Sequence, residues 1–517
     1  MDPNDPTQTS VPPSGNQVFP PPTSPTPTVP NLSELNETPV VPSSPVSPPP
    51  TTPPPVSSTF TPTPDIKESR FNFKKIGIVF GLLAIIGLFI YLVVMLVLPR
   101  LGLFQKEVHL TWWGLWEDEA IVAPIIEEYQ SQNPNVKISY TAQAKEDYRE
   151  RLTNALAEGS GPDIFRFHNS WVPMFYNSLA PVPAEIISSE EFSQTFYPVA
   201  ISDLTTAKGF VGIPLEYDGL GLFINEEIFA TYTKTPPTTW DELKDTALAL
   251  TIVDQNGIVK QSGVALGRTE NVDHWPEIVA LMLLQNGGSI NNPSDHLAEG
   301  ALAYYASFDS VYKIWDETLP PSTTFFANGK LAMYFAPSWR AIEILSLNPN
   351  LKFKIVPVPQ LPKDSATEPD ITYASYWIEG VSEESNQKLE AFKFLKYLST
   401  KETLQKLYGL EAASAPNRPF GEPYPRVDMK DLLTTDPYLG GVIALAGSAK
   451  SGYLASRTFD GPSGINSRLV QYYKDAINAI GTQGVRASEK ILETLSLGVQ
   501  QVLSDYGLVA PPATPAP

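Results

Sequence analysis

Cysteine is absent from this 517-residue chain. Without a thiol, the protein can form no disulfide, bind no metal through thiolate ligands and use no cysteine nucleophile. The attachment point of a bacterial lipid anchor is missing as well. A domain of several hundred residues can be stable without disulfides, because a chain of this size buries a large apolar core.

Charged residues are missing from the stretch 76–98, IGIVFGLLAIIGLFIYLVVMLVL. As a helix it would reach about 35 Å, which is enough to cross a hydrocarbon core of roughly 30 Å. A cleavable signal peptide has a shorter apolar part that ends in small residues. This stretch ends instead at Leu98-Pro99-Arg100. We therefore predict an uncleaved transmembrane signal anchor, with the helix at 76–98 inside the segment 67–106.

Basic residues are more frequent before this stretch than after it, and the richer flank normally stays in the cytoplasm. The preceding bases are Lys67, Arg70, Lys74 and Lys75, and those that follow closely are Arg100 and Lys106. The N-terminus is therefore expected inside. Everything after residue 100 is expected on the extracytoplasmic side, held in the cell membrane by the chain's own helix.

Residues 1–66 contain few large apolar residues and no Lys or Arg, and Pro, Ser and Thr dominate their composition. Such a composition does not offset the entropy of ordering, so we expect a disordered cytoplasmic tail with polyproline II bias. Residues 107–517 carry a net charge of −20. An outer part this acidic is a poor partner for nucleic acid.

Strand and helix patterns alternate after residue 107. Val122, Ile125 and Ile126, for example, recur at the spacing of one helical face. The predicted order is a strand at 107–116, a helix from 118, a strand at 136–141, a helix at 148–156 and a strand from 163. This order favours an α/β fold with a largely parallel, doubly wound sheet, whose ligand lies outside the carboxyl ends of the strands.

Several segments, in this order and at this spacing, resemble the extracellular solute-binding protein family 1, the maltose- and oligosaccharide-type receptors of ABC importers. They are residues 133–136, 156–164, 210–229, 236–243, 285–288, 325–333, 337–339 and 391–395. The resemblance covers nearly all of residues 107–505. The chain departs from the family in its proline-rich tail, its membrane segment and the loosely matching stretch 414–419.

The resemblance implies a two-lobe, periplasmic-binding-protein-like ectodomain (a type II Venus flytrap) that holds its ligand between the lobes. The expected crossovers lie near 216–223, 371–380 and 414–420. The implied boundaries are 107–217 and 372–416 for lobe 1, 223–370 and 420–508 for lobe 2, and 509–517 for a disordered C-terminus.

Aromatic rings next to polar side chains suit a carbohydrate cleft, because sugar faces stack on rings while hydroxyls need polar partners. The expected ligand-binding residues are Trp113, Asn169, Trp171, Tyr217, Asp218, Trp339, Tyr376 and Trp377. Trp113 lies toward the carboxyl end of the first predicted strand, and the resemblance marks Asn169, Trp171, Asp218 and Trp339. For Asp218 the alternative is an acid in a surface loop, and for Trp339 it is core packing.

No motif in the sequence points to catalysis, a cofactor or a metal. The four histidines lack metal-ligand spacing, and no nucleophile elbow, P-loop or dinucleotide-binding pattern is present. Asp163 and Asp218 could be nominated as a glycosidase pair, but their spacing gives this no support.

The resemblance therefore implies a receptor, not an enzyme, that captures a small ligand, and the apolar stretch 76–98 predicts that this receptor is tethered to the membrane. The expected ligand is a mono- or oligosaccharide, and the expected partners are the permease subunits of an ABC importer. Two other interpretations remain open. One is a ligand-binding sensor or surface adhesin without a transport role, and the other is a glycoside-acting enzyme.

Overall fold

The computed structural model of the chain describes residues 73–93, 95, 107–363, 365, 367–483 and 489–510. The predictions for the tail 1–66, the linker 99–106 and the C-terminal residues 511–517 fall outside this part.

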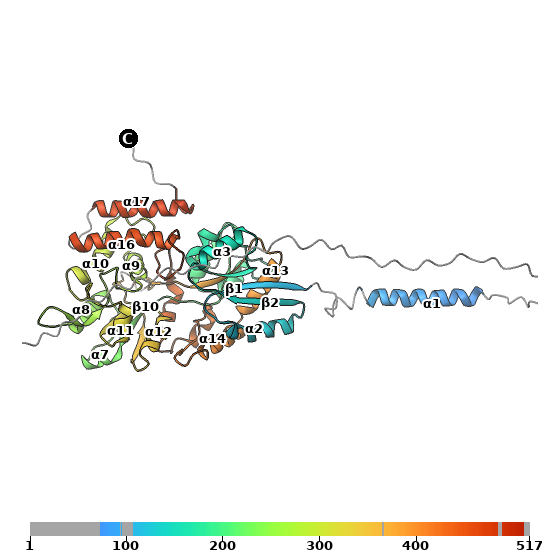
Figure 1. Cartoon of the computed structure of the whole chain (residues 1–517), viewed down its shortest axis with the longest axis horizontal. Helices are drawn as coiled ribbons and strands as arrows, with labels where there is room; N and C mark the ends of the chain where they lie inside the picture. The colour runs from blue at the N-terminus through green and yellow to red at the C-terminus, as the bar shows by residue number, and fades with distance from the viewer. Residues whose placement is uncertain are drawn as a thin grey trace, which may run out of the picture. The chain divides into compact units, whose positions relative to one another are not determined.

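Helix α1 (Phe73–Leu92) covers most of the predicted membrane span (Figure 1). Its side chains Ile78, Phe80 and Phe89 are more than half exposed. Among the residues that the structure describes, no helix is both long and apolar enough to cross a membrane. Residues 94 and 96–98 of the predicted span lie outside that part. The transmembrane prediction for 76–98 is therefore not supported by the described helix.

The first sheet has the strand order β2-β1-β3-β13-β6. Its strands are β1 (Val108–Gly114), β2 (Val136–Ala142), β3 (Ile164–His168), β13 (Trp377–Val381) and β6 (Ile213–Pro214). β1 pairs in parallel with both β2 and β3, which confirms the predicted order of the first three strands. β13 is antiparallel to β3 and β6, so a late segment of the chain completes this sheet.

Helices on both faces of this sheet complete the first lobe (Figure 1). They include α2 (Glu119–Gln132), α3 (Tyr148–Ala157), α4 (Val172–Phe175), α5 (Ser189–Thr195), α6 (Pro198–Leu204), α13 (Lys388–Leu398) and α14 (Lys401–Ala412). The predicted apolar face of α2 is buried. Trp112 on β1 contacts Phe394 on α13 edge to face, with ring centroids 5.7 Å apart. Apolar side chains at helical spacing thus hold both helices on the sheet.

The second sheet has the order β11-β7-β10-β9-β8. Its strands are β7 (Leu220–Asn225), β8 (Ile252–Val253), β9 (Val259–Val264), β10 (Leu331–Pro337) and β11 (Phe353–Val356). β10 is buried at every position and lies at the centre, antiparallel to β7 and parallel to β9. A strand with both faces covered is expected to be apolar throughout, as the sequence LAMYFAP nearly is.

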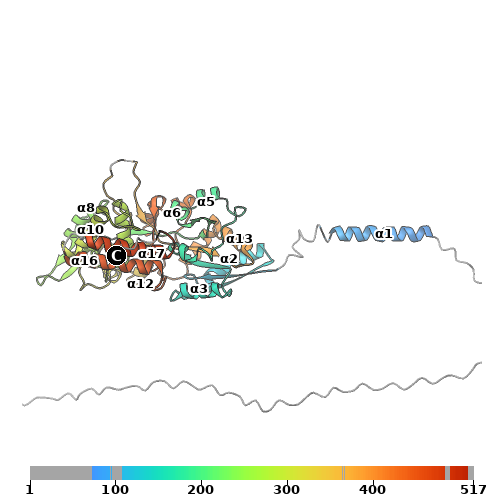
Figure 2. The ribbon, with the colours of Figure 1, turned by 90° about the horizontal axis from the view of Figure 1, so that it is seen from above.

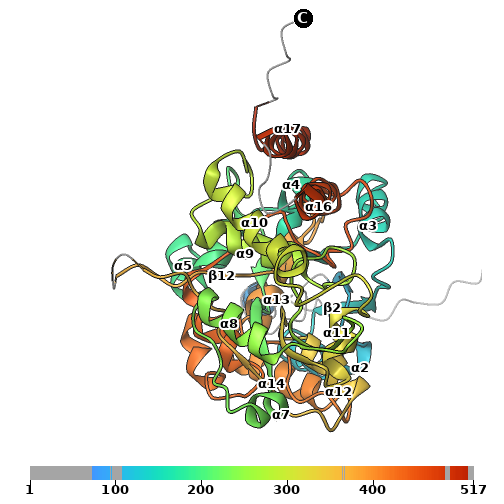
Figure 3. The same ribbon diagram turned by 90° about the vertical axis from the view of Figure 1, so that its left-hand side faces the viewer.

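Helices surround the second sheet and form the second lobe. They include α7 (Glu226–Thr231), α8 (Trp240–Leu250), α9 (Trp275–Gln285), α10 (His296–Ser310), α11 (Ser322–Ala327), α12 (Arg340–Leu347), α15 (Gly440–Ala444), α16 (Ile465–Gln483) and α17 (Glu489–Asp505). α8 begins with a capping box, in which Thr239 and Glu242 satisfy each other's backbone N–H groups. Figures 2 and 3 show α16 and α17 side by side along this lobe, next to α10.

Extended segments cross between the two sheets. One leads from β6 to β7, and another leads through β12 (Thr372–Tyr373) to β13; they meet at an antiparallel bridge between Gly219 and Ala374. A Cβ on Gly219 would lie 2.8 Å from the carbonyl oxygen of Tyr373, so the approach requires glycine. β7 begins at Leu220, ahead of the predicted start of lobe 2 at 223. The exact lobe boundaries remain predictions.

Candidate functional site

The two crossover segments that contain Asp218 and Tyr376 divide the space between the lobes into two sides. Side chains of an extended segment alternate in direction, so neighbouring residues point to opposite sides. The hydroxyl of Ser375 lies 2.9 Å from His168 Nε2, whereas the hydroxyl of Tyr376 donates to Asp203 at 2.8 Å. We name the side that carries Trp116, His168, Trp171, Trp339 and Trp377 the aromatic side, and the side that carries Asp203 the cavity side.

Trp377 is the centre of the aromatic side in lobe 1. Its ring makes edge contacts with Trp116, Trp171 and His168 at centroid distances of 5.4, 5.3 and 5.1 Å. Its backbone N–H donates to Glu216 at 3.0 Å. Trp171 is fully buried and supports the others, while Trp116 and Trp377 are partly exposed. The exposed rings are therefore held in place by a buried aromatic base.

His168 adds a polar but uncharged group to this cluster. Burial lowers the pKa of His168 to about 3, so the imidazole is neutral near pH 7. Its Nδ1 lies 2.7 Å from Ser170 Oγ, and its Nε2 is paired with Ser375. Both ring nitrogens are thus engaged by hydroxyls. His168 thus contributes a neutral polar group beside the rings of this cluster.

Trp339 is the corresponding partly exposed ring of lobe 2. The guanidinium carbon of Arg340 lies 4.5 Å from the centre of its ring, and the ring of His274 contacts it edge on at 5.5 Å. Arg340 is itself buried and donates from Nε to His274 Nε2 at 2.8 Å. A cation above a ring and an edge contact beside it fix the ring's orientation. Trp339 is therefore a pre-positioned aromatic platform.

Asp218 connects the first crossover to the turn that carries Trp339. Its carboxylate accepts hydrogen bonds from Ser338 N–H at 3.0 Å, from the Ser338 hydroxyl at 2.9 Å and from Trp339 N–H at 3.3 Å. Gly219 N–H donates to it at 2.7 Å. Burial raises the pKa of Asp218 to about 7. Asp218 is thus a buried residue whose hydrogen bonds hold the first crossover to the Ser338–Trp339 turn, and it is not a loop acid on the surface.

A buried group of three paired charges, formed by Arg166, Glu117 and Glu379, holds the loop that carries Trp116. Arg166 on β3 lies 2.7 Å from Glu117 and 2.7 Å from Glu379, and all three side chains are almost fully buried. Trp112 Nε1 also donates to Glu379, at 3.0 Å. Burial raises the pKa of Glu379, an effect that Arg166 opposes. Since Glu117 directly follows Trp116, this pairing fixes the loop that carries the ring.

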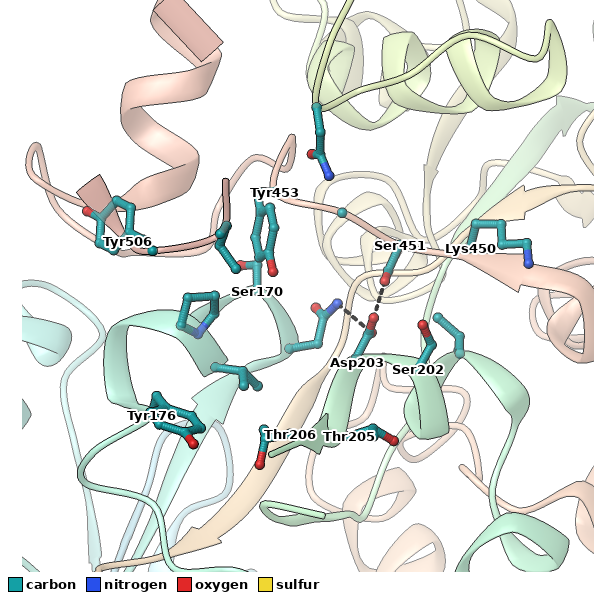
Figure 4. A pocket seen from close by; sticks show the side chains of 18 of the residues that line it. Ser170, Tyr176, Ser202, Asp203, Thr205, Thr206, Lys450, Ser451, Tyr453 and Tyr506 are labelled. Carbon is teal, nitrogen blue, oxygen red and sulfur yellow. Dashed lines mark hydrogen bonds between the residues drawn. The ribbon is translucent and has the colours of Figure 1, made fainter. Parts of the chain in front are cut away.

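The cavity side holds an open space of about 730 Å³ (Figure 4). Its lining comes from both lobes and includes Asn169, Tyr176, Asp203, Thr206, Lys450, Ser451, Tyr453 and Tyr506. Asp203 accepts hydrogen bonds from Asn169 Nδ2 at 2.9 Å and from the hydroxyls of Tyr376 and Ser451. Burial raises the pKa of Asp203. This side is organised around one carboxylate.

The predicted site residues therefore fall into three groups. Trp171, Asp218, Trp339 and Trp377 lie on the aromatic side. Asn169 and Tyr376 lie on the cavity side, and Tyr217 is buried against the rings of Tyr197 and Tyr376. Trp113 is partly buried on β1, on the face opposite Trp112. Within the described part of the chain, no ring contact connects Trp113 to the aromatic cluster. Ligand contact by any of these eight residues remains a prediction.

Sequence reasoning missed Trp116, His168, His274, Arg340 and Asp203. Trp116 is the last residue of the first predicted strand, so the position outside the carboxyl end that favours Trp113 favours Trp116 as well. Asp203 had no such signal, because its partner Ser451 is 248 positions away. Across the residues that the structure describes, no group of three or more His, Asp or Glu side chains could hold a metal ion.

The profile of the bacterial extracellular solute-binding proteins matches residues 124–419. The chain belongs to this family. The predicted resemblance is confirmed, with the two lobes and the crossovers as its structural basis.

A curated relative is the maltotriose-binding protein of Pyrococcus abyssi, which is 21% identical over 316 residues. The match covers 59% of this chain and 65% of that relative's length. Similar solved structures include a cyclo/maltodextrin-binding protein complexed with maltotetraose, at 15% identity and a TM-score of 0.62. This structural match covers 77% of this chain and 98% of the cyclo/maltodextrin-binding protein.

The sugar-binding protein MalE from Xanthomonas citri is 17% identical to this chain, with a TM-score of 0.60. The structural match covers 77% of this chain and 98% of the MalE chain. These structural likenesses establish the two-lobe, periplasmic-binding-protein-like α/β fold that the sequence predicted.

Proposed function

We propose that this protein is an extracytoplasmic receptor that captures a small saccharide between its lobes and delivers it to an ABC importer. The observation that carries the proposal is the pair of pre-positioned, partly exposed aromatic groups on the two lobes. Trp339, backed by Arg340, is the lobe 2 member, and Trp377 with Trp116 forms the lobe 1 member. Rings of this kind stack on sugar faces, and the saccharides named for the relatives point to the same ligand class.

Capture would work by population shift. A ligand that contacts both lobes has a higher affinity for the closed arrangement than for the open one, so its binding favours closure. The crossover segments are the elements that change conformation, and Asp218 transmits their position to Trp339 through Ser338. The permease would then recognise the closed arrangement.

A glycosidase role is not favoured by the geometry. Asp163 accepts hydrogen bonds from the Thr111 hydroxyl at 2.9 Å and the Ser385 hydroxyl at 2.6 Å, so its carboxylate is used in the fold. The Asp218 carboxylate is used by the Ser338 turn. Neither acid is free to act on a glycosidic bond.

Membrane tethering through residues 76–98 is part of the same proposal. Its support is the charge-free sequence with a basic flank before it. Protease added to intact cells should degrade the binding domain and spare residues 1–66. Loss of the tail with survival of the domain would reverse the orientation, and recovery of the protein in the soluble fraction would contradict the tether.

The saccharide assignment is tested by a thermal-shift screen of sugars, amino acids and polyamines on the full-length protein. A sugar at a hundredfold excess over its Kd should stabilise the protein by about 2.7 kcal/mol. Stabilisation by amino acids or polyamines alone would contradict the assignment. Purification from membranes with permease subunits attached would support delivery to an importer, whereas signalling partners alone would favour a sensor.

A further inference from the structure

A loop of lobe 2 enters the aromatic side and carries a ring of its own. This loop, residues 456–464, lies between β14 (Ala449–Lys450) and α16. The ring of Phe459 lies 6.0 Å from that of Trp116, centroid to centroid. Lys145 Nζ lies 5.5 Å from the centre of the same ring. Phe459 therefore contacts two side chains of lobe 1.

The backbone of this loop is held in an uncommon conformation. Arg457 and Phe459 have φ values of 55° and 51°, and Gly461 has 68°. A left-handed conformation costs a non-glycine residue roughly 1–2 kcal/mol, so it persists only where the surroundings impose it. Asp460, which is almost fully buried, accepts hydrogen bonds from Asn466 N–H at 2.7 Å and the Ser467 hydroxyl at 2.6 Å. The loop is thus anchored to the start of α16.

Two further bonds attach the loop region to lobe 1. Asn466 Nδ2 donates to the Ser170 hydroxyl at 2.7 Å, and Arg149 Nη2 donates to the Ser463 hydroxyl at 2.7 Å. Ser170 directly precedes Trp171, so this attachment lies beside the aromatic cluster. With these bonds and its buried anchor, the loop presents Phe459 to Trp116 as a fixed group.

We propose that Phe459 is a specificity-determining residue that limits the length of the saccharide. The inference rests on the proposed function. The Trp116 ring already has Trp377 and Phe459 as neighbours at contact distance. A saccharide long enough to place a further sugar ring over Trp116 would have to displace Phe459, and the contacts of Phe459 with Trp116 and Lys145 would be lost. A monosaccharide or disaccharide beside Trp339 and Trp377 would leave Phe459 in place.

The test is calorimetric titration of the full-length protein in detergent. The probes are α-1,4-linked glucose and β-1,4-linked mannose series of one to six units. The unaltered protein should bind the one- or two-unit member of its preferred series most tightly. Phe459→Gly removes the ring and relieves the left-handed strain. It should shift the ratio of affinities toward the four- to six-unit members by about tenfold, or about 1.4 kcal/mol.

Two further variants separate the ring from the backbone. Phe459→Tyr keeps a ring and should retain the original length preference. Lys313→Gly relieves a left-handed residue of the same φ range, 53°, at an exposed position and should leave the preference unchanged. If the ratio of affinities for long and short saccharides in Phe459→Gly stayed within twofold of that in the unaltered protein, the proposal for Phe459 would be overturned and the proposed function would stand. Absence of saccharide binding by the unaltered protein would overturn it together with the proposed function.

Discussion

The aromatic side and the cavity side of the crossover segments are built from different chemistry. On the aromatic side, Trp116, Trp339 and Trp377 keep part of their rings exposed, and the neighbouring His168 is neutral. On the cavity side, Asp203 gathers hydrogen bonds from Asn169, Tyr376 and Ser451. An open space of about 730 Å³ lies on the cavity side, and the partly exposed rings lie on the aromatic side.

The open space and the partly exposed rings therefore indicate two different places for a ligand, and the chemistry of the two sides has to decide between them. In the cavity, the buried carboxylate has its hydrogen bonds satisfied by the protein, as a structural connection requires. On the aromatic side, the exposed rings have firm support and free area, as a binding surface requires. We therefore assign ligand capture to the aromatic side, and the predictions below test this assignment.

The largest expected effect concerns the pH dependence of stability through Asp218. Burial raises the pKa of Asp218 from 3.8 to about 7 in the folded protein. The folded state thus holds the proton more tightly, so the contribution is fully present below pH 4 and is lost as pH rises through 7. Relative to Asp218→Asn, the unaltered protein should lose about 3–4 kcal/mol of unfolding free energy across this range.

Urea unfolding between pH 4.5 and 8 measures this difference. Asp505→Asn, on the surface beside Arg468, is a matched control and should run parallel to the unaltered protein above pH 5. If the curve of Asp218→Asn were also parallel to that of the unaltered protein, the raised pKa of Asp218 would be contradicted.

The second effect concerns the ring of Trp339. Trp339→Ala removes the platform of lobe 2 and should weaken saccharide binding by about thirtyfold, or roughly 2 kcal/mol, whereas Trp339→Phe should retain most of the affinity. Calorimetric titration with the saccharide found by the thermal-shift screen gives both values. Tyr453→Ala removes a ring from the cavity side and should change the affinity less than threefold. A larger loss for Tyr453→Ala than for Trp339→Ala would reverse the assignment of the two sides.

The smallest effect concerns the hydrogen bond across the cavity. Ser451→Ala removes one of the three donors to Asp203 and should lower the free energy of unfolding by about 1 kcal/mol. Saccharide affinity should change less than threefold, because Asn169 and Tyr376 still hold the carboxylate. Chemical denaturation and titration of the same preparation check both values. A tenfold loss of affinity would mean that the cavity side takes part in binding.

Local patterns predicted much of the fold. The spacing of Val122, Ile125 and Ile126 predicted α2, and the alternation at 136–141 predicted β2. Because side chains alternate along an extended segment, the sequence also implies opposite directions for Tyr217 and Asp218 and for Tyr376 and Trp377. In the membrane segment, by contrast, a sequence pattern led to a prediction that the described helix does not support.

The tertiary contacts of the site could not be read from local patterns. Ser451 meets Asp203 and Phe459 meets Trp116 only because the chain returns to the first lobe after completing the second. The hydrogen bond between Ser338 and Asp218 and the ring contact between His274 and Trp339 depend in the same way on packing between distant segments. Composition around Phe459 gave no sign that its ring would reach lobe 1.

A crystal structure of the full-length protein with its saccharide tests the central claim most directly. The sugar should lie on the aromatic side, stacked on Trp339 within about 4 Å of its ring, with Trp377 on the opposite lobe. A saccharide found instead in the cavity beside Asp203, with the face of Trp339 unoccupied, would contradict the assignment.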